Sequence, residues 1–335
     1  MTDLESLLAC PVDKSPLQRA DHVLRCANGH EFPVVEGIPV LLPPDANDTI
    51  DAMGATRVAV SSASNDDPLY LKTLGLDENE RTRLRHNFER GGYEIDPVVS
   101  YMVAATCGNI YKGLVGRLPR YPIPDFRLKN GSEKLLLDLG CNWGRWCVAA
   151  SREGFVPVGI DPQIGAVLAA RRVAKQLGIT AHFVCGDARH LPFRADVFDT
   201  VFSYSVLQHL SRNDVSDVAN ESRRVMKPGA ESFIQMPHAL GIRCLQQQIR
   251  RGFREANGFE VRYWSLAQLR VLFEKMIGPT TFEIDCFFGI GLQGSDVDML
   301  PAGLATLVRL SEVLRQVPPL RFVADSVYVR SQNVE

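Results

Sequence analysis

Five short apolar runs alternate with amphipathic stretches of helical length, and this alternation limits the possible folds more than any other feature of the chain. Strands buried on both faces of a parallel sheet have such continuous apolar runs, and the intervening helices cover the two faces. Two later runs, at 282–288 and 324–329, bring the expected number of strands to seven. We therefore predict an α/β fold with a doubly wound, mostly parallel seven-stranded sheet. The first five runs are 135–139, 156–160, 182–185, 198–203 and 231–236.

Composition shifts divide the 335 residues into four parts. Residues 1–43 hold short strand patterns around a Glu-Gly turn and predict a small β-rich domain. Residues 44–68 lose hydrophobicity and gain Ser, Asn and Asp, which is typical of a linker. Residues 69–130 carry helix-start signals and predict a helical cap. Residues 131–335 contain the sheet, with an insertion at about 237–280 between its fifth and sixth strands.

The overall composition is that of an ordinary globular protein, with 45% hydrophobic and 23% charged residues. A net charge of -2 argues against a surface dedicated to coating a polyanion, so nucleic acid is not the expected partner. We find no apolar stretch of the roughly 18 residues that a membrane span needs. Acidic residues near the start do not fit a signal peptide, and the eight scattered cysteines are typical of reduced thiols. The expected location is therefore the cytoplasm.

A glycine-bearing turn follows the first strand of the predicted sheet. Gly140 and Gly144 allow close approach of a ligand at the carboxyl edge, where open α/β sheets bind their ligands. A dinucleotide fingerprint would need glycine at 140, 142 and 145, but the chain has Asn142 and Arg145. The turn therefore predicts a ligand site of a different kind.

Aspartates close three successive strands: Asp138, Asp161 and Asp187. A carboxylate that ends the second strand is well placed to accept hydrogen bonds from both hydroxyls of a ribose. A single such aspartate is more often a helix cap, but three in register favour a nucleoside-containing cofactor.

These motifs resemble those of Rossmann-like S-adenosylmethionine-dependent methyltransferases. Asp138, Gly140 and Gly144 match the first family motif, and Asn142 replaces its middle glycine while tolerating a left-handed backbone. The loop that ends Leu207-Gln208-His209-Leu210 and the Lys227-Pro228-Gly229 turn also match, so the resemblance covers roughly 133–236. It implies S-adenosylmethionine as cofactor. The residues implied to bind it are Asp138, Gly140, Cys141, Asn142, Gly144, Asp161, Asp187, Ala188 and Ser203.

The loop after the fourth strand also offers two residues for catalysis. An oxygen acceptor needs a base to take its proton, and His209 lies where the resemblance places the reactive methyl group. Tyr204 is the second catalytic residue we propose, because it is placed to position an acceptor. The alternative interpretations are a core histidine and a packed aromatic ring.

The N-terminal unit resembles the zinc ribbon that precedes the methyltransferase domain in ribosomal RNA guanine-N1 methyltransferases. Cys10, Asp13, Cys26 and His30 reproduce its ligand spacing, with Asp in place of the second cysteine. This set is able to close a tetrahedral zinc site, but a ribbon that has lost its metal fits as well. Because residues 32–41 form an unusually apolar strand pair, we expect packing rather than metal to hold this unit.

The sequence leaves three functions open. The first is a methyltransferase for a small-molecule, lipid-linked or glycan-linked acceptor, and the second is a ribosomal RNA base methyltransferase. The third is a non-catalytic, cofactor-binding assembly partner. Basic residues of the insertion either grip a phosphate, a carboxylate or RNA, or form a solvated helix face. They are His238, Arg243, Arg250, Arg251 and Arg254.

Overall fold

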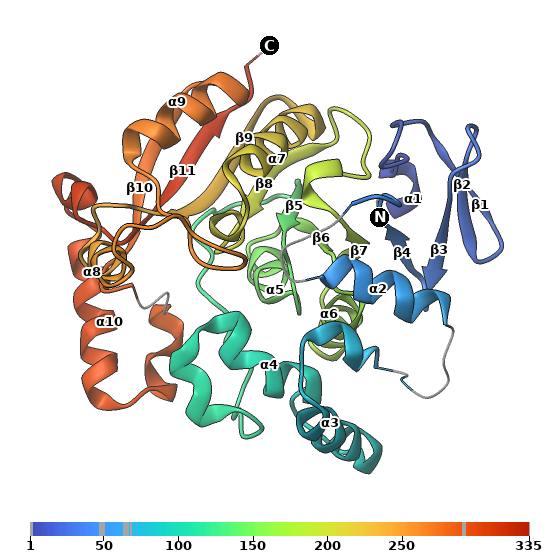
Figure 1. Cartoon of the computed structure of the whole chain (residues 1–335), viewed down its shortest axis with the longest axis horizontal. Helices are drawn as coiled ribbons and strands as arrows, with labels where there is room; N and C mark the ends of the chain where they lie inside the picture. The colour runs from blue at the N-terminus through green and yellow to red at the C-terminus, as the bar shows by residue number, and fades with distance from the viewer. Residues whose placement is uncertain (1–2, 47–50, 63–66, 68, 290–292, 335) are drawn as a thin grey trace.

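The computed structural model describes residues 3–46, 51–62, 67, 69–289 and 293–334. A twisted sheet runs through the molecule, with helices packed on both of its faces (Figure 1). Its seven central strands lie in the order β7-β6-β5-β8-β9-β11-β10. Their bounds are β5 Leu135–Leu139, β6 Val156–Asp161, β7 His182–Gly186, β8 Phe198–Ser203, β9 Met226–Pro237, β10 Thr280–Cys286 and β11 Ser326–Gln332.

The sheet confirms the predicted doubly wound α/β fold. Neighbouring strands from β7 to β9 are parallel, whereas β11 runs antiparallel to both β9 and β10. Among these seven strands β5 comes first in the chain and lies in the middle of the sheet. The later strands are added on both sides of it, so the strand order reverses beside β5. Ligands of such sheets bind at the carboxyl ends of the strands, at the point of reversal.

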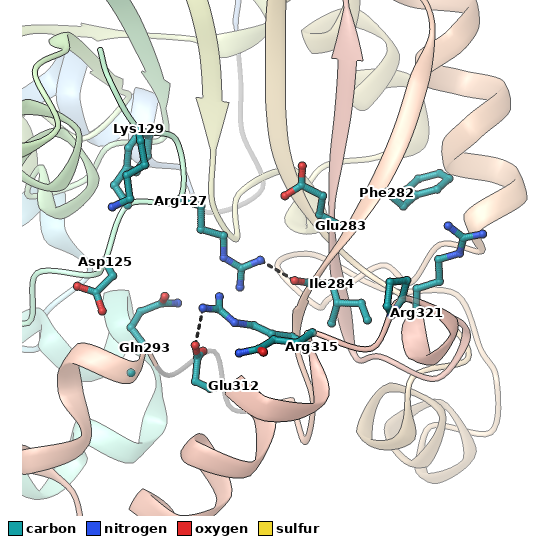
Figure 2. A pocket seen from close by; sticks show the side chains of 14 residues that line it. Asp125, Arg127, Lys129, Phe282, Glu283, Ile284, Gln293, Glu312, Arg315 and Arg321 are labelled. Carbon is teal, nitrogen blue, oxygen red and sulfur yellow. Dashed lines mark hydrogen bonds and ion pairs between the residues drawn. The ribbon is translucent and has the colours of Figure 1, made fainter. Parts of the chain in front are cut away.

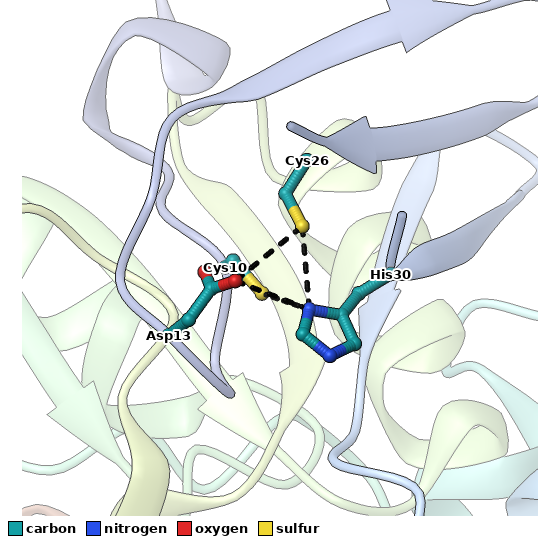
Figure 3. A group of neighbouring side chains, drawn as sticks. All are labelled: Cys10, Asp13, Cys26 and His30. Atoms are coloured by element: carbon teal, nitrogen blue, oxygen red, sulfur yellow. Dashed lines mark hydrogen bonds and ion pairs between the residues drawn. The ribbon is translucent and has the colours of Figure 1, made fainter. Parts of the chain in front are cut away.

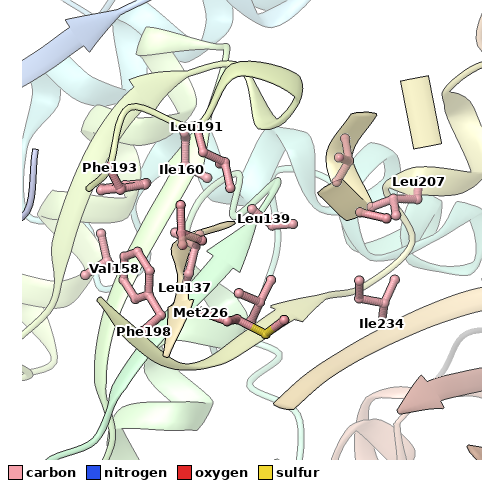
Figure 4. Packing of buried hydrophobic residues seen from close by; sticks show 14 of the residues in the cluster. Leu137, Leu139, Val158, Ile160, Leu191, Phe193, Phe198, Leu207, Met226 and Ile234 are labelled. Atoms are coloured by element: carbon pink, nitrogen blue, oxygen red, sulfur yellow. The ribbon is translucent and has the colours of Figure 1, made fainter. Parts of the chain in front are cut away.

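Alternation along the strands divides the core between the two faces of the sheet. Leu137 and Leu139 of β5 join the cluster beneath the helices α7 (Arg212–Val225) and α9 (Leu266–Met276), part of which Figure 4 shows. Leu136 points to the other cluster, which includes buried residues of α5 (Arg145–Arg152) and α6 (Ile164–Gln176). Capping boxes begin α7 at Ser211 and α9 at Ser265. Residues 131–335 also contain the helices α8 (Ile242–Arg250) and α10 (Ala302–Leu314).

The small N-terminal domain pairs directly with the main sheet and is not connected to it by a linker alone. It contains α1 (Leu4–Leu7) and four strands, and its last strand β4 pairs in parallel with β7. The sheet therefore has eleven strands in the part of the chain that the structure describes. The four strands are β1 Leu17–Ala20, β2 Val23–Cys26, β3 Glu31–Val35 and β4 Ile38–Leu41.

The segment for which the sequence predicts a linker, 44–68, contains a helix instead. This helix, α2 (Ala52–Ser61), buries Ala52, Met53 and Thr56. Thr56 Oγ1 donates to the carbonyl oxygen of Pro162 at 2.8 Å and accepts from the backbone of Ile164. The polar composition hid this helix because its few buried side chains pack on a distant part of the chain.

Residues 69–114 are mostly helical and pack against α6, whereas residues 115–130 form an irregular connection to β5. Asp96 caps α4 with its carboxylate buried, and Arg172 of α6 pairs with that carboxylate at 2.6 Å. Within the described ranges every helix is too short or too polar to cross a lipid bilayer. The elements of this segment are η1 Leu71–Leu74, α3 Glu78–Arg90, α4 Pro97–Cys107 and η2 Asn109–Leu114.

Candidate functional site

A cavity of about 430 Å³ opens at the carboxyl edge of the sheet, where the strand order reverses. The ends of β5, β6, β7 and β8 all contribute to its wall. Seven of the residues predicted from the sequence line it: Gly140, Asn142, Asp161, Asp187, Ala188, Tyr204 and His209. The structure therefore brings together residues that are widely separated in the chain.

The glycine-bearing turn after β5 adopts the left-handed backbone that its sequence predicts. Gly140, Asn142 and Gly144 have φ values of 71°, 45° and 81°. Asn142 tolerates this conformation, and its Oδ1 accepts a hydrogen bond from the backbone of Trp143 at 2.9 Å. A Cβ atom on Gly140 would lie 2.4 Å from a methyl carbon of Val206, so a side chain there is excluded.

Asp161 connects the end of β6 with the turn after β5. Its Oδ2 accepts from the backbone N–H of Asn142 and its Oδ1 from that of Gln163, both at 3.0 Å. The carboxylate is therefore held at the wall of the cavity by two backbone donors.

Asp187 holds the end of β7 in a different way. It caps the short helix η3 (Ala188–His190), and it forms an ion pair with Arg189 at 2.9 Å. Arg189 also pairs with Asp214 at 3.0 Å. Asp187, which the resemblance assigns to the cofactor, thus lies in a network of alternating charges that the sequence motif does not contain.

Four residues that the resemblance assigns to the cofactor do not line the cavity. Asp138 is buried, accepts from the thiol of Cys147 at 3.3 Å, and has its pKa raised by burial to about 7. Ser203 Oγ donates to the carbonyl oxygen of Leu139 at 3.0 Å, which ties β8 to β5. Cys141 and Gly144 lie within the turn, below its lining surface. These four residues shape the floor of the site.

The structure adds lining residues that the motifs did not indicate. Met53 comes from α2, while Ala105 and Thr106 come from α4. Thr106 is fixed because its hydroxyl oxygen accepts from the indole N–H of Trp143 at 3.1 Å. Further additions include Gln163, Arg189, Ser205, Asp214 and Phe259.

Tyr204 lies in a buried hydrogen-bond network. Its hydroxyl donates to Asp285 Oδ2 at 3.2 Å and accepts from Gln293 Nε2 at 3.1 Å. Burial raises the pKa of this hydroxyl well above its ordinary value. Tyr204 is therefore suited to form a wall of the site and not to act as a base.

A larger cavity, of about 550 Å³, lies between residues 125–129, β10, α10 and the short helix η6 (Pro318–Phe322) (Figure 2). Arg127 on its wall pairs with Asp285, the partner of Tyr204. Arg315 pairs with Glu312, and Lys129 pairs with Glu153. Because three of its four basic residues are ion-paired, this cavity presents little free positive charge to a ligand.

His209 presents a neutral imidazole to the first cavity. Its Nδ1 lies 2.7 Å from the carbonyl oxygen of Phe259, which only accepts, so Nδ1 carries the proton. Nε2 then holds the lone pair and accepts from Gln208 Nε2 at 3.1 Å. Burial lowers the pKa of His209, and its ring stacks on Phe259 at 3.8 Å between centroids.

A second pocket, of about 230 Å³, shares Tyr204 and Ser205 with the first cavity. Asp325, which is 1% exposed, also lines it. Its Oδ1 accepts from the backbone N–H groups of Arg243 and Cys244 at the start of α8. Its Oδ2 is buried and has no hydrogen-bond partner among the described residues. Because buried carboxylate oxygens normally have a partner, this atom needs a donor that the described residues do not supply.

The four predicted metal ligands converge in the N-terminal domain (Figure 3). Their ligand atoms all lie within 4.8 Å of one another. His30 Nδ1 is 3.5 Å from Cys10 Sγ, 3.3 Å from Cys26 Sγ and 3.3 Å from Asp13 Oδ2. A tetrahedral zinc site with bonds of about 2.3 Å to sulfur and about 2.0 Å to nitrogen or oxygen has edges of roughly 3.3–3.8 Å. The arrangement fits zinc.

Comparison with known proteins identifies the central domain. The family model described as "Methyltransferase domain" matches residues 136–229. The bifunctional biotin biosynthesis protein BioHC of Cellvibrio japonicus is 34% identical over 99 residues, covering 30% of this chain and 19% of that protein. The ubiquinone biosynthesis O-methyltransferase of Brucella anthropi is 28% identical over 99 residues, covering 30% of this chain and 39% of that enzyme. A solved S-adenosylmethionine-dependent methyltransferase of Methanosarcina mazei is 17% identical, with a TM-score of 0.45, covering 61% of this chain and 93% of that one.

The strand order, the site at the reversal point and the family match together define a class I, Rossmann-like methyltransferase domain, as the sequence motifs predict. S-adenosylmethionine is the cofactor of this class. The chain spans less than half the length of the curated relatives named above.

Proposed function

We propose that the protein transfers a methyl group from S-adenosylmethionine to a small acceptor that carries a hydroxyl or amino group. The observation that carries this proposal is the pair of adjoining pockets. One is lined by the strand-end acids Asp161 and Asp187, and the other contains the unpartnered oxygen of Asp325. A donor group on the acceptor would satisfy that oxygen.

The residues of the first cavity fit the cofactor. Asp161 would accept hydrogen bonds from the ribose hydroxyls, and Asp187 would accept from the adenine amine. Gly140 keeps the turn open to the methionine end. When bound, the cofactor supplies a methyl group that its sulfonium already activates. The protein then has to hold the acceptor in line and close to that methyl group.

His209 would remove the proton of a hydroxyl acceptor. Its Nε2 lone pair faces the side chain of Gln208, which lines the second pocket. An acceptor hydroxyl that takes the place of the Gln208 amide donates to Nε2 and loses its proton there as the methyl group transfers. Arg262 bonds to the backbone oxygen of His209 at 2.9 Å and keeps the loop in place.

Ion pairing of two of the insertion's arginines disfavours ribosomal RNA as acceptor. Arg254 and Arg251 both pair with Glu260, at 2.6 and 3.9 Å. A nucleic-acid site needs several unpaired cations to displace counterions from phosphates. The RNA alternative would also require extruding a base into a second pocket of only about 230 Å³.

Labelling of cell fractions tests the proposed function. Purified protein is incubated with methyl-labelled S-adenosylmethionine and separated lipid, polar-metabolite and RNA fractions. We expect label in the lipid or polar-metabolite fraction. Stoichiometric label in ribosomal RNA that disappears in Arg250→Ala/Arg251→Ala would favour the RNA methyltransferase instead. Cofactor binding with no label in any fraction would favour the assembly partner.

Replacing Asp161 by alanine should weaken the binding of S-adenosylmethionine roughly ten- to a hundredfold. Each hydrogen bond to a charged group is worth about 1.5–3 kcal/mol, and the ribose would lose its carboxylate partner. Isothermal titration calorimetry measures the affinity. Asp217→Ala, which removes an exposed carboxylate from α7, is the matched control and should bind normally. Unchanged affinity in Asp161→Ala would show that the cofactor binds elsewhere.

Replacing Asp325 by asparagine should raise the KM for the acceptor about tenfold while leaving the cofactor affinity unchanged. Asparagine keeps an oxygen for the backbone donors of α8 but removes the charge at the unpartnered position. Steady-state kinetics with the acceptor isolated from the labelled fraction measures KM and kcat separately. An unchanged KM would remove Asp325 from the acceptor site.

A further inference from the structure

The helix α8 exposes two of its apolar side chains to solvent, which is unusual for a surface helix. Ile242 and Ile249 are 51% and 59% exposed, whereas Cys244 is buried. The Gln248 amide donates to the carbonyl oxygens of Ala239 and Cys244 and so faces the protein. Surface helices usually turn their apolar stripe toward the core and their polar side chains toward water. In α8 this arrangement is reversed.

Helical geometry places the two isoleucines on one face. They lie two turns apart, so at 3.6 residues per turn they point in nearly the same direction. Cys244 points to roughly the opposite side. Phe253, just after the helix, is 65% exposed, and Leu240, just before it, is 58% exposed. We call Leu240, Ile242, Ile249 and Phe253 the outer face of α8.

Exposed apolar side chains continue beside the start of the helix. Gly241 lies against the backbone of Asp325, since an added Cβ would come within 2.4 Å of its Cα. The segment that leads into Asp325 exposes Phe322 and Val323. The outer face therefore has further exposed apolar residues beside it. The helix α8 itself lies at the periphery of the molecule, on the side away from the N-terminal domain (Figure 1).

Two arginines flank the outer face. Arg243 and Arg250 are exposed and lie two turns apart, on one side of the isoleucines. Neither forms an ion pair with any residue that the structure describes, in contrast to Arg251 and Arg254, which pair with Glu260. The outer face thus combines an exposed apolar stripe with unpaired positive charge.

We propose that the outer face of α8 docks on an anionic lipid surface. An apolar stripe flanked by arginines is the pattern of helices that lie in the plane of a membrane interface, with the stripe among the acyl chains and the cations at the phosphates. A protein partner would need complementary acidic groups around an apolar groove, whereas a lipid surface supplies both features along the whole stripe.

Docking would place the acceptor pocket at the lipid surface. Arg243, Cys244 and Gln247 of α8 line the pocket next to the cofactor cavity. A lipid-borne acceptor therefore needs to raise only its polar headgroup past α8 to reach Asp325. This step rests on the methyltransferase function proposed above, whereas lipid docking itself does not.

Vesicle sedimentation tests the docking surface. The full chain is mixed with sucrose-loaded vesicles of phosphatidylcholine alone or of phosphatidylcholine mixed with phosphatidylglycerol. We expect binding to the mixed vesicles that weakens with added salt, and weak binding to phosphatidylcholine alone. Arg243→Gln and Arg250→Gln should each weaken binding roughly fivefold. Equal binding to both vesicle types, or no binding to either, would overturn the proposal.

Substitution of the apolar residues distinguishes binding through the outer face of α8 from nonspecific adsorption to vesicles. Ile242→Ser/Ile249→Ser/Phe253→Ser should weaken vesicle binding roughly a thousandfold, because each of the three apolar side chains contributes about tenfold when fully inserted. Val271→Ser, which changes a 68% exposed residue of α9, is the matched control and should bind like the unchanged protein. Calorimetry with S-adenosylmethionine checks that the triple variant folds.

Three outcomes keep this proposal distinct from the function. A triple variant that binds vesicles like the unchanged protein would overturn the docking surface. The outer face would instead be a protein interface if the unchanged protein self-associates in gel filtration and does not bind vesicles, while the triple variant is monomeric. Vesicle binding without methyl transfer to any fraction would support the docking surface and contradict the proposed function.

Discussion

Replacing His209 by glutamine should lower kcat with a hydroxyl acceptor by about 10²–10⁴-fold, the usual contribution of a positioned general base. Glutamine offers no imidazole lone pair to take the proton. Cofactor affinity should stay unchanged, because the strand-end acids that would hold the ribose and adenine are intact. Steady-state kinetics and calorimetry on the same preparation measure both quantities.

The pH dependence of kcat/KM also tests whether His209 is the base. Only neutral His209 accepts a proton, and burial lowers its pKa below the ordinary value of 6.5. Protonation therefore removes the base only at a pH below 6.5, and kcat/KM should stay level as the pH falls to that value and decline below it. In His209→Gln this decline should be absent. A profile that breaks well above 6.5 would assign the base to another group.

Two further variants separate catalysis from structure. His209 stacks on Phe259 and bonds to its carbonyl oxygen, so its loss would also loosen the loop. Phe259→Leu removes the stacking but keeps the imidazole and should lower kcat far less. His190→Gln changes an exposed histidine of η3 and should have no effect. If Phe259→Leu were as damaging as His209→Gln, the histidine would be a positioning residue.

Much of the cofactor cavity could be predicted because parallel strands end at one edge. Gly140 and Asp187 each follow a strand directly and Asp161 ends one, so the alternation of strands and helices is sufficient to place them together. Asp138 occupies the same motif but lies two residues before Gly140, inside β5. Its side chain points under the turn, which periodicity alone does not reveal.

The residues that the sequence did not indicate come from segments whose position depends on tertiary packing. Met53 reaches the cavity because Thr56 fastens α2 to the end of β6, a bond between residues about a hundred positions apart. Phe259 reaches it through the fold of the insertion against His209. Neither residue stands in a motif, and the polar composition of 44–68 pointed away from a helix.

What stabilises the N-terminal domain could be predicted from the sequence only in part. Its apolar strand pair predicts stabilisation by packing, and β4 does pack on the main sheet through β7. The two knuckles that carry Cys10 and Cys26 lie beyond that pairing, where β1 is largely exposed. Cys10 and Cys26 themselves are buried in the main hydrophobic cluster, and the distances from His30 Nδ1 to the other three ligand atoms match a tetrahedral zinc site.

We propose on this basis that one zinc ion holds the knuckles, and that Cys10→Ser should remove it. Structural zinc contributes on the order of 10 kcal/mol in small zinc domains, so its loss should unfold residues 9–35. Metal analysis should find one zinc per chain in the unchanged protein and none in the variant. Limited proteolysis should then cleave the variant within the knuckles, and a strong chelator should make the unchanged protein equally susceptible.

The cofactor site should survive this loss. All four ligands are donated by the N-terminal domain, so no position would stay open for chemistry, and none of the four lines the cavity at the ends of β5 to β8. Cys10→Ser should therefore bind S-adenosylmethionine almost as tightly as the unchanged protein. Cys107→Ser, which changes a buried thiol of α4, is the matched control and should keep its zinc. Absence of zinc from the unchanged protein, with the knuckles still resistant to protease, would show that packing alone holds this domain.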